Sequence, residues 1–154
     1  MKKENRFLIS CPAKEEVLPH ASTITNFMKL IPRQNLTVIQ PDLKKYNADH
    51  DKIQHALDHP VISPNTPKQN LWNILKSKSL KGLVQQKFDV FLDLDPHFSL
   101  LNIYLCLKLH PPVRISFPKP RINSVYNFQY NEKPGTPYSE KLNGLLQFLQ
   151  NLIS

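Results

Sequence analysis

Short runs of aromatic and β-branched residues alternate along this chain with longer stretches in which apolar residues recur at three- and four-residue steps. This change between strand and helix periods is typical of βαβ units, in which successive strands lie parallel in one sheet. The clearest run covers residues 88–94, where aromatic and β-branched residues stand in an apolar stretch. A strand that is apolar on both sides of its pleat must be covered on both faces. We therefore expect residues 88–94 at the centre of a parallel sheet with helices on both faces.

The same patterns predict the other elements. We expect strands at residues 6–10, 36–39, 61–62 and 113–117, and an edge strand at 125–130. We expect helices at residues 15–30, 49–57, 71–84, 98–109 and 138–153. The chain is thus predicted to form one α/β domain over residues 1–154, with a three-layer, Rossmann-like, doubly wound and mostly parallel sheet in the order 3-2-1-4-5.

The helix predicted at residues 71–84 carries several finer expectations. We expect Asn65 or Thr66 to cap it and Gly82 to interrupt it. Its Trp72 is at core spacing, as are Phe88 and Phe91 in the following strand, and we expect all three aromatic residues to serve packing.

The composition limits the classes of protein to which this chain can belong. A chain of 154 residues with 40% hydrophobic residues can bury one core without disulfides or metal ions. No segment approaches the roughly 18 consecutive apolar residues of a transmembrane helix, and Pro12 and polar residues interrupt any signal peptide. With Cys11 and Cys106 as the two cysteines, reduced thiols are expected. We expect a cytoplasmic protein without a transmembrane segment.

The formal net charge of +8 favours encounters with anionic groups. Lys and Arg are spread along the chain, without zinc-finger spacing or the signature of an RNA-binding sheet, so nucleic-acid binding is not favoured. The three glycines, Gly82, Gly135 and Gly144, all lie outside the loop after the first strand. Dinucleotide and ATP sites need glycines to bring backbone N–H groups against phosphate, so we expect no cofactor.

Ligands of open α/β sheets bind at the carboxyl ends of the strands, where the strand order reverses. In the expected order this point lies between the first and fourth strands. It brings together seven candidate residues, namely Cys11, Lys14, Glu15, Glu16, Asp93, Asp95 and His97. Neighbouring carboxylates repel one another, which raises a carboxyl pKa and can create a base or a cation site. We expect any bound ligand or strongly perturbed carboxylate here.

A structural interpretation of these candidates stays open beside the functional one. Glu15 and Glu16 suit the first turn of a helix because of its dipole, and Asp95 suits a helix cap. Lys14 can meet an anion at the helix N-terminus or can simply be solvated. Cys11 is a candidate through its position in the loop.

Asp51, His55 and His59 are spaced four apart, which on a helix places them on one face. Two histidines in this spacing can bind a metal ion. The surrounding stretch is so polar that a solvated helix face is the better interpretation, and we expect no metal site.

A series of short motifs runs through the chain in a fixed order. They are Phe7-Leu8-Ile9-Ser10, Val17-Leu18-Pro19, the strand at 36–39, residues 88–94, Ser99, Val113-Arg114-Ile115-Ser116-Phe117 and Tyr126-Asn127. In this order the chain resembles the N-terminal lobe of the ADP-heptose:lipopolysaccharide heptosyltransferase family, whose members have two Rossmann-like lobes in the arrangement called GT-B. The resemblance spans most of the chain.

The resemblance implies an acceptor-binding lobe with a general base. Family members carry a glycine–aspartate pair before the first helix, and the aspartate is the presumed base that deprotonates the acceptor hydroxyl. The matching positions here are Glu15 and Glu16, so Glu16 is the candidate catalytic base. Its side chain is longer by one methylene, and the glycine that lets the acceptor approach the backbone is missing. The family's second lobe, which holds the nucleotide-sugar donor, has no counterpart in these 154 residues.

Two functions are favoured by these observations, and nucleic-acid or general anion binding through the net charge of +8 is a third, less favoured one. The first is a stand-alone, non-catalytic lobe that binds a protein partner, another copy of itself, or an acidic or glycan ligand. The second is the acceptor-binding half of a heptosyltransferase-like enzyme that another chain or a second copy completes, with an acceptor of lipopolysaccharide type. We favour the first, because one lobe cannot hold donor and acceptor in attack geometry.

Overall fold

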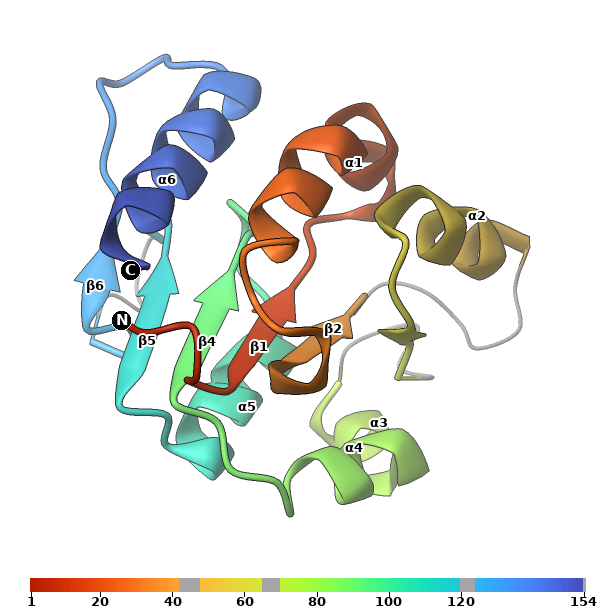
Figure 1. The fold of residues 1–154 in the computed structure, drawn as a ribbon. Coiled ribbons are helices and arrows are strands. Elements are labelled where there is room, and N and C mark those ends of the chain that lie inside the picture. The colour runs from red at the N-terminus through yellow and green to blue at the C-terminus, as the bar shows by residue number, and fades with distance from the viewer. Residues whose placement is uncertain (42–47, 65–69, 120–123, 154) are drawn as a thin grey trace.

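Parallel strands form a single sheet at the centre of the molecule (Figure 1). The structure, a computed structural model, describes residues 1–41, 48–64, 70–119 and 124–153, with Lys14 and Ala48 described by their backbone alone. Within these residues the sheet has six strands in the order β3-β2-β1-β4-β5-β6, and every pair is parallel. The predicted doubly wound α/β fold and the predicted order of the first five strands are confirmed.

The strands place polar residues at one edge of the sheet. They are β1 (Phe7–Ser10), β2 (Leu36–Ile39), β3 (Val61–Ile62), β4 (Val90–Asp93), β5 (Val113–Ser116) and β6 (Phe128–Gln129). β4 lies between β1 and β5 and is buried along its whole length, as its apolar sequence predicts. In the register of these strands, Ser10 pairs with Asp93 and Asp93 with Ser116. Three buried polar residues thus end the three central strands side by side.

Helices cover both faces of the sheet (Figure 1). One face carries α1 (Lys14–Met28), α2 (Ala48–Leu57) and α6 (Tyr138–Leu152), and the other carries α3 (Leu71–Lys76), α4 (Lys78–Leu83) and α5 (Leu100–Leu109). Side chains of a strand alternate between faces, so Phe7 and Ile9 pack in the core beneath α1 and α6, while Leu8 packs in the core beneath α3 to α5. Among the described residues, no helix is both long and apolar enough to cross a membrane.

The predicted break at Gly82 is wrong. The helical stretch is interrupted at Ser77, whose backbone is extended (φ −66°, ψ 120°) and whose hydroxyl accepts a hydrogen bond from the Leu80 N–H at 3.4 Å. Serine favours such a cap because its oxygen competes with the helical carbonyls for backbone N–H groups. Asn70 caps α3 by accepting a hydrogen bond from the Asn73 N–H at 2.8 Å, whereas Asn65 and Thr66 lie outside the described residues.

The predicted packing role of Trp72 is also wrong, because 65% of this residue is exposed. In α3 only Ile74 is buried. Trp72 lies two positions earlier and therefore about 200° around the helix, on the opposite side. Phe88 and Phe91 are buried as predicted.

Candidate functional site

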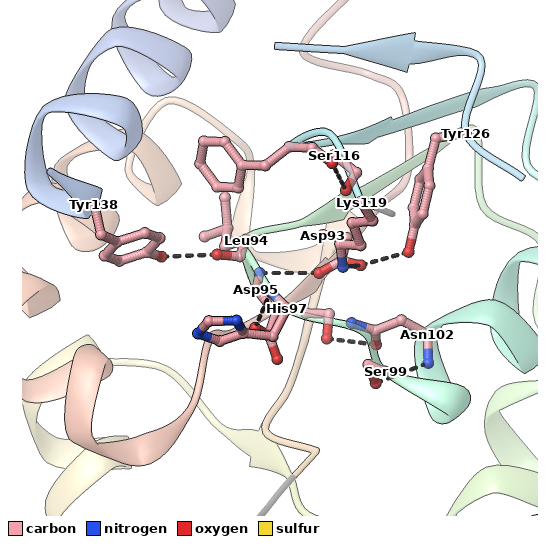
Figure 2. A network of polar contacts seen from close by, with 12 residues as sticks. Asp93, Leu94, Asp95, His97, Ser99, Asn102, Ser116, Lys119, Tyr126 and Tyr138 are labelled. Carbon is pink, nitrogen blue, oxygen red and sulfur yellow. Dashed lines mark hydrogen bonds and ion pairs between the residues drawn. The ribbon is translucent and has the colours of Figure 1, made fainter. Parts of the chain in front are cut away.

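A buried charged network lies at the carboxyl end of β4 (Figure 2). Figure 2 shows Asp93, the last residue of β4, between Lys119 and Tyr126. The Asp93 carboxylate forms an ion pair with the Lys119 ammonium and accepts a hydrogen bond from the Tyr126 hydroxyl at 2.5 Å. Asp93 and Lys119 are almost completely buried, and Tyr126 is 4% exposed. This network connects the sheet with the chain after β5.

Burying an ion pair removes two charges from water, and their attraction offsets that loss only where the remaining hydrogen-bonding capacity is also used. Asp93 meets this condition, because its second oxygen accepts a hydrogen bond from the Asp95 N–H at 2.9 Å. Apolar residues of similar size would pack at least as well in such a position. Natural proteins depart from the best packing mainly at functional sites. The network therefore marks the carboxyl edge as the candidate site.

Asp95 stands in the turn that follows β4. Its carboxylate accepts a hydrogen bond from the His97 N–H at 2.8 Å, so it closes a turn of its own and does not cap α5. The cap of α5 is Ser99, whose hydroxyl accepts from the Asn102 N–H at 3.2 Å. Burial raises the pKa of Asp95 above its ordinary value of 3.8, and the Asp93 carboxylate adds to the rise, while the bond from His97 and the charge of Lys119 act against it.

We expect Asp95→Asn to stabilise the protein increasingly as pH rises. Because the folded-state pKa is raised, the native state holds the Asp95 proton more tightly than the unfolded chain does. The wild type therefore loses stability as pH rises from the Asp95 pKa of the unfolded chain to that of the folded protein. The asparagine side chain stays neutral and avoids this loss, and its oxygen can still accept the hydrogen bond from His97. Urea unfolding across this pH range should show a difference between variant and wild type that grows and then levels off. Glu4→Gln, an exposed control, should show little change; a flat or reversed difference for Asp95→Asn would contradict the account.

Ser10 and Asn102 form a second buried pair beside the charged network. The Ser10 hydroxyl donates to the Asn102 side-chain oxygen at 2.7 Å, and both residues are 0% exposed. Among the described residues, the Asn102 side-chain nitrogen has no hydrogen-bond partner. A buried donor without a partner is destabilising and calls for an explanation, of which a binding role is one.

Tyr138, the first residue of α6, joins α1 to the end of β4. Its hydroxyl donates to the Leu94 carbonyl at 2.7 Å, and its ring lies 5.3 Å from the His20 ring between centroids. The Glu16 carboxylate is 3.7 Å from the His20 imidazole, and 39% of its side chain is exposed. Burial raises the pKa of Tyr138, and the charges of Asp95 and Glu16 are among those that raise it further. Both carboxylates thus lie near enough to the Tyr138 hydroxyl to raise its pKa.

The predicted site residues lie at two depths. Those that are exposed or partly exposed are Glu15, Glu16, Asp95 and His97. Asp93 and Cys11 are buried, and Cys11 belongs to the core beneath α1. The backbone of Lys14 begins α1, but its side chain lies outside the described residues. Among the candidates whose side chains the structure describes, only Glu15, Glu16, Asp95 and His97 can contact a ligand directly, and Asp93 supports Asp95 from the interior.

The two cysteines are not joined by a disulfide, and they are buried in different cores. Burial raises the pKa of the Cys106 thiol to about 12. This thiol is therefore protonated at neutral pH and a poor nucleophile.

Sequence reasoning missed Lys119, Tyr126, Tyr138 and Asn102 as parts of the site. Lys119 lies between the strands predicted at residues 113–117 and 125–130, where a lysine is normally solvated. For Tyr126, the only indication of a role in the sequence was its place in the Tyr126-Asn127 motif. The missing information was the spatial position of the chain after β5, which local patterns do not contain.

Three adjoining cavities open at the opposite, amino-terminal edge of the sheet. They measure about 330, 320 and 450 Å³, and Arg33 and His59 line all of them. On the carboxyl side, a cavity of about 290 Å³ is lined by Glu15, Leu18, Asp49 and Ile53, between α1 and α2. The amino-terminal cavities are thus a competing location for a ligand.

The predicted common helix face of Asp51, His55 and His59 is wrong for His59, because α2 ends at Leu57. All three residues line the cavity of about 450 Å³. In the part of the chain that the structure describes, no group of three or more His, Cys, Asp or Glu side chains is arranged to hold a metal ion.

Comparisons with protein-family models, curated proteins and solved structures give no match for this chain. The resemblance to a heptosyltransferase lobe therefore stays a prediction that rests on the motifs themselves.

Proposed function

We propose that the carboxyl edge of the sheet binds a sugar-type, polyhydroxylated ligand, and that the chain is a glycosyltransferase-like lobe that binds this ligand without turning over a nucleotide-sugar by itself. The observation that carries the proposal is the buried network of Asp93, Lys119 and Tyr126, which lies directly beneath the partly exposed Asp95. Such a network holds the turn after β4 in one geometry, and a binding site needs that rigidity.

The side chains near Tyr138 at the carboxyl edge suit hydroxyl groups. The carboxylates of Glu16 and Asp95 accept hydrogen bonds, and the imidazoles of His20 and His97 can donate or accept them. A phosphate would meet these carboxylates with charge of the same sign. The three glycines of the chain also lie outside the loop between β1 and α1, so no glycine-rich cradle for a diphosphate stands there. The ligand class that fits best is a neutral glycan.

A second function is favoured by one specific feature, the exposure of Glu16. A general base must reach the hydroxyl that it deprotonates, and Glu16 keeps 39% of its side chain exposed beside His20. This feature fits the acceptor-binding half of a heptosyltransferase-like enzyme, with a separate chain or a second copy holding the donor.

A thermal-melt series tests the proposal. A dephosphorylated lipopolysaccharide core oligosaccharide should stabilise the wild type, by roughly 2.7 kcal/mol at about 100 times its dissociation constant, which raises the melting temperature by several degrees. Glu16→Gln and Asp95→Asn each remove a charged acceptor and should weaken this binding about tenfold or more. ADP-heptose should give a flat series, because the loop between β1 and α1 offers no glycine-rich cradle for a diphosphate.

The same assay distinguishes the binding lobe from the acceptor-binding half of an enzyme. A saturable shift with ADP-heptose, or transfer of its sugar that Glu16→Gln abolishes, would favour the enzymatic half over the binding lobe. Absence of any shift with the oligosaccharide would reject a glycan as the ligand. Glu140→Gln, at an exposed position of α6, serves as a matched control and should bind the oligosaccharide like the wild type.

A further inference from the structure

Three large apolar side chains of α3 face solvent. They are Leu71, Trp72 and Leu75, exposed by 54%, 65% and 46%, and we call them the α3 patch. The helix is held to the protein by the buried Ile74 and by contacts with α4 and α5. The α3 patch therefore lies on a helix that packs against the rest of the protein through another side.

Exposed lysines stand on the helices at this side of the sheet, and one of them contacts the α3 patch. Lys76, Lys78 and Lys81 of α3 and α4 are exposed, and the Lys76 ammonium lies 4.4 Å from the centroid of the Trp72 ring. An exposed Lys108 stands on α5, which packs against α3. This side of the sheet therefore presents apolar and cationic groups together.

Acidic residues are absent from the same part of the sequence. Residues 59–88 and 96–131 contain no Asp or Glu, although the whole chain has twelve. These two stretches supply α3, α4 and α5, the three helices on this side of the sheet. The acids are concentrated elsewhere, so the formal charge of +8 is distributed unevenly over the fold.

We propose that the α3 patch and its lysines bind the surface of a membrane that contains anionic lipids. Tryptophan and leucine favour the boundary between headgroups and acyl chains, and lysines extend to the headgroups while their stems cover apolar surface. The absence of acids leaves nothing on these helices to repel an anionic leaflet. An anionic membrane accounts for both the apolar and the cationic groups of this side.

The single tryptophan of the chain gives a direct test, because Trp72 is the only source of tryptophan fluorescence. The purified protein is titrated with phosphatidylcholine vesicles with and without phosphatidylglycerol. We expect the emission to shift to shorter wavelength with the anionic vesicles and much less with the neutral ones, and binding measured by cosedimentation to weaken as salt is added.

Two variants separate the contributions. Lys78→Gln combined with Lys81→Gln should weaken cosedimentation with anionic vesicles about 25-fold, at about fivefold for each lysine. Leu75→Ala should weaken it severalfold, since less apolar surface enters the membrane boundary. Matched controls on the other side of the sheet are Lys52→Gln on α2 and Leu152→Ala on α6, both exposed, and these should bind like the wild type. Circular dichroism confirms that each variant is folded.

Several outcomes would overturn the proposal. Equal binding to neutral and anionic vesicles, or a lysine variant that binds like the wild type, contradicts the role of charge. No fluorescence shift and no cosedimentation contradicts membrane binding altogether. A concentration-dependent dimer in the absence of lipid, lost in Leu75→Ala, would assign the α3 patch to an interface between copies of this chain. A shift produced equally by an oligonucleotide would assign the face to polyanions in general.

Discussion

Lys119→Met is expected to lower the free energy of unfolding by about 3–5 kcal/mol, the usual effect of removing one partner from a buried ion pair. Methionine keeps the length of the side chain and removes its charge. The Asp93 carboxylate is then left in the interior, where it accepts hydrogen bonds from the Tyr126 hydroxyl and the Asp95 N–H. Neither donor carries a charge, so the desolvation of the carboxylate is no longer offset.

Urea unfolding of four proteins at neutral pH checks this expectation. Lys133→Met, at an exposed lysine, should change stability by less than about 0.5 kcal/mol. The double variant Asp93→Asn with Lys119→Met should recover much of the loss, because the amide oxygen still accepts hydrogen bonds without carrying a charge. A loss below about 1 kcal/mol for Lys119→Met, or no recovery in the double variant, would show that the ion pair is not buried as described.

Phe91→Ala is expected to lower the free energy of unfolding by about 3–5 kcal/mol, as for other large-to-small changes at buried phenylalanines. Phe91 is 0% exposed in the centre of β4 and packs in the core beneath α3 to α5. Truncation leaves a cavity between the sheet and those helices, which the surrounding residues fill only in part.

Phe98→Ala is the matched control. Phe98 lies seven positions later, and 59% of it is exposed. Its truncation should change stability by about 0.5 kcal/mol or less. Chemical denaturation of both variants compares them directly; similar losses at the two positions would contradict the placement of α3 to α5 against β4.

The fold was largely predictable because its strands are locally distinctive. Residues 36–39 and the central β4 combine β-branched or aromatic residues with complete or near-complete burial, so period and composition agree. The position of Asp93 at the end of β4 was also predictable, because this residue directly follows the apolar residues 90–92 of the strand. The order of the sheet also put Glu16 and Asp95 on the same side of the molecule, near Tyr138.

The depth of individual side chains was not predictable in the same way. Lysine is rarely buried, and only the position of the chain after β5 reveals that Lys119 reaches Asp93. Trp72 shows the opposite failure, because its spacing fits a core face while the short helix α3 turns it outward. In both cases the deciding interaction is between segments far apart in the sequence, which periodicity does not report.

Nuclear magnetic resonance mapping of the bound oligosaccharide tests the central claim most directly. A ¹⁵N-labelled sample is titrated with the dephosphorylated core oligosaccharide, and backbone amide shifts are followed at both edges of the sheet. The account predicts saturable shifts at Glu16, Asp95 and His97, with little change at Arg33 and His59. Shifts concentrated at Arg33 and His59 would place the ligand in the amino-terminal cavities and contradict the assignment of the carboxyl edge as the binding site.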